Sequence, residues 1–300
     1  MDIIKPNLTI DADLTKLKFP YYAQPKIDGV RGIHLWGKPY LTARSLKPFG
    51  NTLVPLIFDN VQGYDGELTY GNITSPDLCR NTTSVVTTYN DIRAADLVLN
   101  LFDYITPTTI KLPYEKRYDL LSSLASEPLI KVVSNTVINT LDELLEFEET
   151  CVGLGYEGVI LRNPKGMYKN GRSTVQENTF LRLKQFTQED ALVIDLIEAY
   201  SNQNEATTNA LGNIERSSHK NNLVPNNMVG TLICIDRKTG NKIKVGPGKM
   251  THEDRKYYWN YPELIIGQTI SYKSMPYGKL NAPRFPTFEY IRPIEDLTNE

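Results

Sequence analysis

The stretch Lys26-Ile27-Asp28-Gly29-Val30-Arg31 places charged side chains and a glycine between two short apolar segments. The flanking segments, residues 21–26 and 32–36, have the composition of β-strands. A lysine at a strand end beside a glycine turn can sit in a partly desolvated pocket near other cations, which lowers its pKa and frees the amine to attack phosphorus. The same short pattern also describes a surface turn with solvated charges, so the rest of the chain has to decide between the two interpretations.

Around this stretch the first half of the chain alternates short β-rich pieces with two helical patterns. Helical spacing is found over Tyr114 to Leu124 and over Thr140 to Leu154, where Thr140 and Glu143 form the pattern of a capping box. Further strands are predicted at residues 62–68, 97–105, 158–162 and 179–185. These elements predict one mixed α/β domain over residues 1–187.

After residue 187 the pattern changes to short strands divided by polar turns. The strands are predicted at residues 191–199, 230–236, 241–245, 269–272 and 288–291, a series typical of a small β-barrel over residues 188–300. Residues 200–228 form an Asn- and Thr-rich stretch that is too long for an ordinary turn, and such loops are often functional. We therefore predict an α+β chain of two domains.

The composition agrees with a soluble two-domain protein. The chain has 300 residues, of which 40% are hydrophobic and 23% are charged. No apolar run reaches the ~18 residues that a membrane span needs, and the first 20 residues lack the pattern of a signal peptide, so we expect a cytoplasmic protein. Cys79, Cys151 and Cys234 lie outside any C-x-x-C pattern, which argues against a four-cysteine zinc site and a disulfide framework.

The charge of the chain is unevenly distributed. The formal net charge is −2, yet residues 230–292 contain eleven Lys and Arg against five Asp and Glu. Because clustered positive charge attracts phosphates, this asymmetry indicates that the C-terminal part contacts phosphate groups.

Four further motifs follow the Lys26 stretch along the chain. They are Asp65-Gly66-Glu67-Leu68, Leu101-Phe102-Asp103-Tyr104, Glu157-Gly158-Val159-Ile160-Leu161-Arg162 and Phe180-Leu181-Arg182-Leu183-Lys184. The series resembles motifs I, III, IIIa, IV and V of the covalent nucleotidyltransferase superfamily, which contains DNA ligases, RNA ligases and mRNA capping enzymes. The segment Ala282-Pro283-Arg284-Phe285-Pro286-Thr287-Phe288, followed by Arg292, resembles motif VI in the barrel domain of ATP-dependent DNA ligases.

The resemblance covers nearly the whole chain and is closest to minimal viral and phage ATP-dependent DNA ligases of the Chlorella virus type. It implies a nucleotidyltransferase domain, ATP-grasp-like as in DNA ligases, followed by an OB-fold barrel. Residues 204–206 and 215–220 resemble the inserted hairpin that these ligases use as a latch around DNA, which places a latch near residues 203–227. Val245-Gly246-Pro247-Gly248, with Arg255 and Trp259 after it, also has their barrel pattern.

The resemblance implies a role for each motif residue. Lys26 is the implied nucleophile that carries AMP, Asp28 is implied to help activate the 3′-hydroxyl or a metal, and Glu157 is the implied carboxylate for Mg²⁺, which prefers oxygen ligands. For the nucleotide, the resemblance implies Arg31 and Glu67 at the ribose and Phe102 on adenine. It implies Arg182 and Lys184 at the α-phosphate and Arg284, with Arg292 as a second candidate, at pyrophosphate. Arg44 and Ser45 are the implied contacts of AMP and the nick phosphate, and His219 and Lys220 those of DNA.

Residues Arg182 and Lys184 are two positions apart on a predicted strand, so both side chains point to one face and can reach the same phosphate. In this family, motif V commonly has lysine at the first of these two positions. Arg182 is therefore a departure from the family pattern that keeps the charge but changes its geometry.

Several alternatives remain beside a DNA ligase. An NAD-dependent ligase shares the K-x-D-G core, but it needs an upstream domain and usually a four-cysteine zinc module, whereas 25 residues precede Lys26 and three cysteines are present. An mRNA capping guanylyltransferase or an RNA ligase is the enzymatic alternative, and a noncatalytic nick-binding OB-fold protein is the alternative of another class. We predict a monomeric ATP-dependent DNA ligase that uses ATP and Mg²⁺ to seal 3′-OH/5′-phosphate nicks in duplex DNA through lysyl-AMP and adenylylated DNA.

Overall fold

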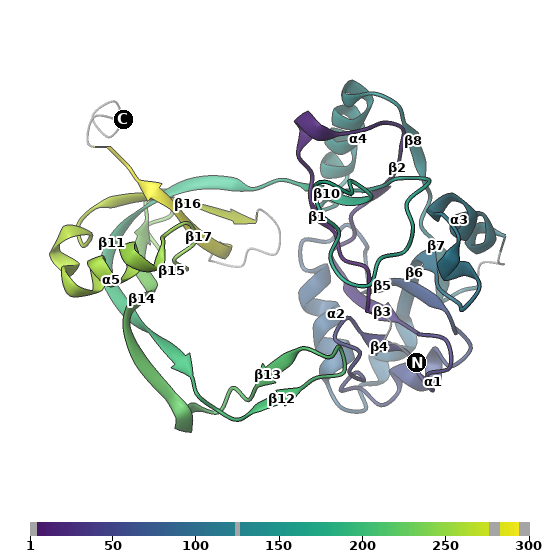
Figure 1. Cartoon of the computed structure of the whole chain (residues 1–300), viewed down its shortest axis with the longest axis horizontal. Coiled ribbons are helices and arrows are strands. Elements are labelled where there is room, and N and C mark those ends of the chain that lie inside the picture. The colour runs from purple at the N-terminus through teal and green to yellow at the C-terminus, as the bar shows by residue number, and fades with distance from the viewer. Residues whose placement is uncertain (1–4, 124–126, 276–282, 294–300) are drawn as a thin grey trace. The chain divides into compact units, whose positions relative to one another are not determined.

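The computed structural model describes residues 5–123, 127–275 and 283–293 of the chain. The chain divides into two compact units, and the boundary lies between Lys184 and Gln185 (Figure 1). The second unit comprises Gln185–Asn209 and the residues from Asn213 on. None of the described helices is both long enough and apolar enough to cross a membrane.

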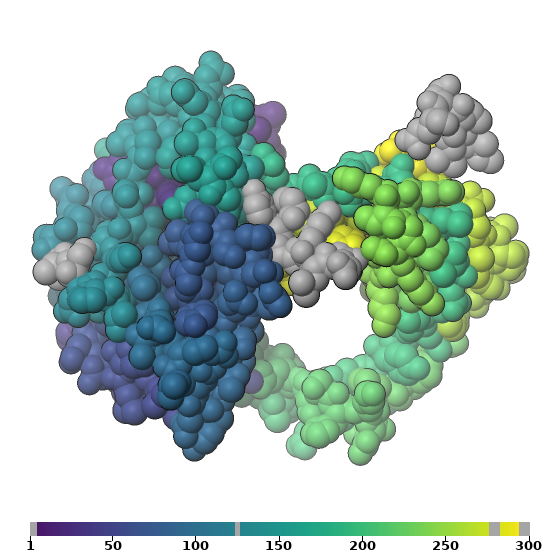
Figure 2. All heavy atoms as spheres, turned by 180° about the vertical axis from the view of Figure 1, so that it is seen from behind, coloured from purple at the N-terminus to yellow at the C-terminus, as the bar shows by residue number. Residues whose placement is uncertain are grey.

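One five-stranded sheet of the first unit has the order β1-β10-β9-β2-β8. Its strands are β1 (Ile10–Asp11), β2 (Tyr21–Pro25), β8 (Thr136–Ile138), β9 (Gly158–Arg162) and β10 (Phe180–Lys184), and a 3₁₀ turn, η1 (Leu14–Lys16), follows β1. Strand β1 pairs with β10 in parallel, and the other pairs are antiparallel. Purple N-terminal atoms accordingly lie among teal atoms in the space-filling view (Figure 2).

Helix α4 (Leu141–Gly153) covers one face of this sheet, where it packs against Ala23, Leu161 and their neighbours (Figure 1). The helix begins as predicted, because the Thr140 side chain accepts a hydrogen bond of 3.2 Å from the Glu143 amide. The expected capping box is not closed in the usual way. The Glu143 carboxylate accepts instead from the backbone N–H of Asn139, one residue before the cap, at 2.8 Å.

The second sheet of the first unit has the order β4-β3-β5-β6-β7. Its strands are β3 (Val30–Ile33), β4 (Thr42–Ala43), β5 (Tyr64–Tyr70), β6 (Leu97–Tyr104) and β7 (Ile130–Val132). The surrounding helical elements are α1 (Val54–Ile57), α2 (Leu78–Thr87), α3 (Tyr114–Ser122), η2 (Ile92–Asp96) and η3 (Thr109–Lys111). Helix α2 was not predicted, because threonine and valine give it a low helix propensity. It forms because Leu78, Thr82, Val85 and Val86 share one buried face.

The second unit contains an antiparallel five-stranded sheet of order β15-β14-β11-β16-β17. The strands are β11 (Thr187–Asn202), β14 (Leu223–Asp236), β15 (Lys242–Val245), β16 (Thr269–Met275) and β17 (Arg284–Ile291), with α5 (His252–Asn260) and η5 (Pro262–Leu264) before β16. A bridge between Gly246 and Thr287 joins the two outer strands, so the sheet curls into an OB-like form. The capping box at the start of α5 is complete between Thr251 and Asp254.

The Asn- and Thr-rich stretch expected as a long loop is largely β structure. Strand β11 continues into the stretch as far as Asn202, and β14 begins within it at Leu223. Between them β12 (Ala206–Thr208) pairs with β13 (Ile214–Arg216). The short turn η4 (Lys220–Asn222) follows this hairpin. The side chain of buried Asn204 donates to the carbonyls of Ser217 and His219 at 2.9 and 2.7 Å, which holds the two sides of the stretch together.

Candidate active site

A cavity of about 500 Å³ lies between the two sheets of the first unit. The first sheet contributes strands β2, β9 and β10 to its wall, and the second sheet contributes β3, β4, β5 and β6. Seven of the residues singled out in the sequence line the cavity together: Lys26, Arg31, Arg44, Ser45, Glu67, Phe102 and Arg182. The motifs therefore converge on one place.

Strand register brings Lys26 beside Glu157 and Lys184. Pro25 pairs with Val159, and Lys184 pairs with Gly158, so the ends of β2, β9 and β10 lie in a row. The Lys26 amide donates to the Gly158 carbonyl at 2.8 Å, and the Glu157 amide donates to the Lys26 carbonyl at 3.0 Å. Both hydrogen bonds fix the backbone of Lys26 directly at the strand end.

Two lysines share the carboxylate of Glu157. Lys26 Nζ forms an ion pair with Glu157 Oε2, and Lys184 Nζ lies 3.9 Å from Oε1. The Glu157 side chain is only 5% exposed and Lys26 is 21% exposed, so this group of charges is largely removed from water. Burial lowers the pKa of Lys184, and the nearby positive charges of Arg182 and Lys26 lower it further against the opposing effect of Glu157.

The glycine after Asp28 is required by a close backbone approach. A Cβ atom at Gly29 would lie 2.2 Å from the Leu68 carbonyl oxygen and 2.8 Å from Glu67 Cγ. Strand β5 can therefore approach the Lys26 turn only because residue 29 has no side chain. Asp28 is half-buried and does not line the cavity, but its negative charge contributes to raising the pKa of Glu67.

Glu67 faces Arg31 across the β3–β5 pair. Burial raises the pKa of Glu67 to about 7, although the positive charges of Lys26 and Arg31 act in the opposite direction. The guanidinium of Arg31 binds the buried Asp65 carboxylate through Nε at 2.8 Å and Nη2 at 2.5 Å, and its Nη1 donates to the Asn7 carbonyl at 2.7 Å. Arg31 lines the cavity, and Asp65 and Asn7 hold it there.

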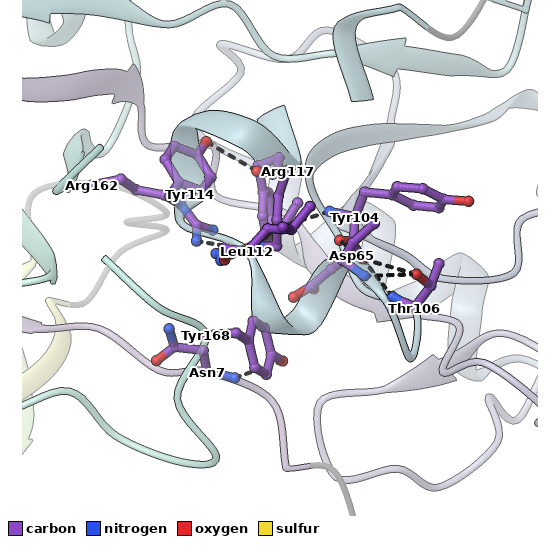
Figure 3. Close-up of polar contacts among 12 residues, drawn as sticks. Asn7, Asp65, Tyr104, Thr106, Leu112, Tyr114, Arg117, Arg162 and Tyr168 are labelled. Carbon is purple, nitrogen blue, oxygen red and sulfur yellow. Dashed lines mark hydrogen bonds and ion pairs between the residues drawn. The ribbon is translucent and has the colours of Figure 1, made fainter. Parts of the chain in front are cut away.

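Phe102 lies over a network of buried charges in the floor of the site. The next residue, Asp103, is fully buried and accepts hydrogen bonds from Arg117 at 2.7 and 3.0 Å and from Arg162 at 3.0 Å. Burial raises the pKa of Asp103, but the two arginines outweigh it, so the pKa lies below its usual value. The Tyr114 hydroxyl donates to the Phe102 carbonyl at 3.1 Å, which ties α3 to β6 (Figure 3).

Arg162 is the side chain that connects this network to the first sheet. Its guanidinium carbon lies 3.8 Å from the Phe180 ring centroid, 4.6 Å from that of Tyr114 and 5.2 Å from that of Phe102. Sequence reasoning quoted Arg162 within its motif without giving it a role. It missed Arg117 altogether, because an arginine on a helix ordinarily indicates a solvated face.

Arg182 forms an ion pair with Asp11, a contact that the sequence did not indicate. Its Nε lies 2.6 Å from Asp11 Oδ1 and its Nη2 lies 3.3 Å from Oδ2. Asp11 ends the short strand β1, which is separated from Arg182 by most of the first unit in sequence. Only the parallel pairing of β1 with β10 reveals the contact.

The remaining sequence-predicted residues belong to the second unit. Arg284 begins β17 and is half-buried, with its guanidinium carbon 5.4 Å from the Phe285 ring centroid, and Arg292 Nε lies 3.0 Å from Asp190 Oδ1. His219 and Lys220 are exposed at the turn η4. Several basic residues of residues 230–292 have acidic partners within the unit, such as Lys273 with Glu289 at 3.5 Å, so the positive excess there is partly compensated.

Comparison with known protein families matches residues 4–184 to the ATP-dependent DNA ligase domain and residues 224–292 to a DNA ligase OB-like domain. This chain belongs to the ATP-dependent DNA ligase domain family. The DNA ligase of African swine fever virus is 26% identical over 106 residues, which are 34% of this chain and 25% of the viral protein. This match therefore spans about a quarter of the length of that relative.

Solved structures of DNA ligases align with nearly the whole length of this chain. Chlorella virus DNA ligase-adenylate is 26% identical and aligns over 97% of this chain and 100% of its own, with a TM-score of 0.51. A structure from the Lig E DNA ligases is 21% identical and aligns over 96% of this chain and 100% of its own, with a TM-score of 0.71, which shows the same fold. The two-part fold predicted from the motifs, a nucleotidyltransferase domain with an OB-like domain, is thus confirmed.

Proposed function

We propose that this chain is an ATP-dependent DNA ligase that seals nicks with a 3′-hydroxyl and a 5′-phosphate in duplex DNA. The observation that carries the proposal is the position of Lys26 at a cavity of nucleotide size, beside one buried carboxylate and a second lysine. A noncatalytic DNA-binding protein has no need for a lysine held in this way. Membership of the ATP-dependent ligase family favours ligation over mRNA capping.

In the first step Lys26 Nζ forms a bond to the α-phosphorus of ATP, and the bond from that phosphorus to the bridging oxygen of the β-phosphate breaks. Pyrophosphate leaves, and the amine gives up its proton to water, since Glu157, its ion-pair partner, stays ionised to hold Mg²⁺. Arg182 and Lys184 supply positive charge for the developing negative charge on the phosphate. AMP then passes to the 5′-phosphate of the nick, and the 3′-hydroxyl displaces it.

The other cavity residues hold the rest of the nucleotide. Phe102 offers its ring to adenine, and Glu67 offers a carboxylate to the ribose hydroxyls. Arg31, already oriented by Asp65, contributes positive charge beside the ribose. Arg44 and Ser45, at the exposed edge of the cavity, contact AMP and the nick phosphate.

Glu157 is the residue that would hold Mg²⁺, and Asp28 lies two positions after Lys26, the ion-pair partner of Glu157. In the part of the chain that the structure describes, no group of three or more His, Cys, Asp or Glu side chains is arranged to bind a metal. A single buried carboxylate nevertheless fits Mg²⁺, because this ion is often held by one or two carboxylates together with substrate phosphates. When bound, the ion neutralises charge on the transferred phosphate.

Nicked duplex DNA is the proposed partner of the second unit. The hairpin of β12 and β13, together with His219 and Lys220 after it, forms the proposed latch on the DNA backbone. Its many Asn, Ser and Thr side chains are suited to phosphate and sugar contacts, which position a protein without reading sequence.

The covalent intermediate provides the test. The wild-type chain, incubated with Mg²⁺ and either α-labelled ATP or α-labelled GTP, is expected to give an acid-labile labelled band with ATP alone on a denaturing gel. Lys26→Ala removes the nucleophile and is expected to abolish the band, whereas the matched control Lys38→Ala, at an exposed lysine of the same unit, keeps it. Labelling by GTP would indicate a capping enzyme, and nick binding without any label would indicate the noncatalytic alternative.

A further inference from the structure

We propose that the N-terminal segment of residues 7–11 orients three arginines of the cavity, and that Asp11 is the positioning residue for Arg182. The proposal rests on the function proposed above, since it assigns a task in lysine adenylylation. It concerns a segment to which neither the motifs nor the family resemblance gives a catalytic task.

Three arginines that line the cavity are each held by an alternate residue of this segment. The Asn7 carbonyl accepts from Arg31 Nη1 at 2.7 Å, and the Thr9 carbonyl accepts from Arg172 Nη1 at 2.7 Å. The Asp11 carboxylate accepts from Arg182 at 2.6 and 3.3 Å. Residues 7, 9 and 11 thus bind arginine side chains that come from three separate parts of the first unit.

Backbone pairing explains why these carbonyls are available. The amide of Leu8 donates to the Gly171 carbonyl, and the Leu8 carbonyl accepts from the Ser173 amide, both at 2.8 Å. In an extended chain the carbonyls of neighbouring residues point in opposite directions, so the Asn7 and Thr9 carbonyls point away from that pairing. Further along, strand β1 pairs with β10 (Figure 1), and the Ala12 amide donates to the Arg182 carbonyl at 2.9 Å, so the register places Asp11 beside Arg182.

Asp11 differs from the other two residues because it acts through its side chain. Its two carboxylate oxygens face Nε and Nη2 of Arg182, an arrangement that fixes the plane of the guanidinium as well as its position. A lysine at position 182 would present a rotatable ammonium, which acts as a point charge and needs no such plane. We therefore interpret Asp11 as the partner that the arginine at this position requires.

Loss of Asp11 has two separable effects on adenylylation. It removes one negative charge near the cavity, so the KM for ATP is expected to stay constant or fall. It also frees the guanidinium to adopt other rotamers, so the rate of lysyl-AMP formation is expected to drop by about fivefold, near the upper limit for a pair as exposed as this one. A merely structural role would lower stability without this fall in rate at a constant or lower KM.

A double-mutant cycle tests the coupling. Single-turnover adenylylation is measured against ATP concentration for wild type, Asp11→Ala, Arg182→Lys and the double variant, with thermal unfolding recorded for each. We expect Asp11→Ala to slow the wild type by about fivefold and the Arg182→Lys background by less than about twofold. Equal losses in both backgrounds, or no loss in the wild type, would overturn the proposal.

A matched control and a second readout complete the test. Asp13→Ala removes another exposed carboxylate two residues along, which is bound to Thr15 and Lys16, and is expected to leave the rate unchanged. The Nε–H signals of arginine in ¹⁵N NMR report orientation without any need for catalysis. The Arg182 signal is expected to broaden in Asp11→Ala while the Arg31 signal persists, and an unchanged Arg182 signal would contradict the proposal even if the wild type formed no adduct.

Discussion

Glu67→Gln is expected to stabilise the first unit at pH 8 and to lose that advantage at pH 5. Burial raises the pKa of Glu67 from 4.5 to about 7 in the folded chain. Between these values the folded state binds more protons than the unfolded state, so the contribution of Glu67 to stability is fully present below pH 4.5 and is lost as the pH rises through 7. Glutamine has nearly the same shape but no titratable charge, so the variant does not lose stability in this way as the pH rises.

The magnitude follows from the size of the shift. At about 1.4 kcal/mol per pKa unit, a shift of about 2.5 units corresponds to about 3 kcal/mol between the two extremes, and to slightly less between pH 5 and pH 8. For a unit of this size that difference is equivalent to about 5–10 °C in Tm. Comparing the two pH values cancels the constant effect of replacing a carboxylate by an amide.

Urea unfolding followed by tryptophan fluorescence can isolate the first unit. The chain has two tryptophans, Trp36 in the first unit and Trp259 in the second, so a Trp259→Phe background leaves Trp36 as the reporter. Glu177→Gln is the control, because Lys169 lowers the pKa of the exposed Glu177 carboxylate. Removing the Glu177 charge is therefore expected to bring no gain in stability at pH 8. Parallel stability curves for wild type and Glu67→Gln from pH 5 to pH 8 would refute the reasoning.

Two further predictions concern the second unit. Arg284→Ala is expected to slow self-adenylylation at least tenfold more than the sealing of a nick that already carries AMP on its 5′ end, since the proposed task of Arg284 ends when pyrophosphate leaves. Equal losses in the two assays would show that Arg284 has a different task. Replacing residues 203–227 by a short Gly-Ser turn is expected to leave lysyl-AMP formation nearly intact and to weaken nick binding by at least tenfold, and unchanged affinity in a gel shift at a stated salt concentration would rule out the latch.

The sequence predicted those features of the site that depend on local pattern. Strands β2 and β6 begin at Tyr21 and Leu97 as predicted, because alternating apolar residues and turn signals lie within a few positions of one another. The convergence of Lys26, Glu67 and Phe102 on one cavity followed from the family resemblance, since no spacing in the sequence shows that three separate strands meet.

The missed parts of the site all depend on long-range packing. The contacts of Asp11 with Arg182 and of Arg117 with Asp103 are made by charged residues that look solvated in the sequence. Arg172 occurs in a loop rich in Gly, Asn and Lys, where a cation ordinarily indicates a mobile surface, yet its guanidinium is bound by the Thr9 carbonyl. The contact of Asp11 with Arg182 becomes visible only when the register of β1 and β10 is known, and the other two likewise depend on packing between distant segments.

A network of buried ion pairs lies where the two sheets meet at the site. Asp65 and Asp103 face each other in neighbouring strands, and their mutual repulsion is relieved by arginines from three other elements. Of these, Arg162 belongs to the first sheet and Asp103 to the second, so their ion pair crosses the floor of the cavity. Replacing such a pair by apolar side chains is often harmless to stability, whereas a fixed guanidinium holds its neighbours in a defined geometry. Arg162 contacts the Phe102 ring on one side of the cavity and Phe180 on the other, so this pair sets the distance between the proposed adenine platform and the strand that carries Arg182 and Lys184.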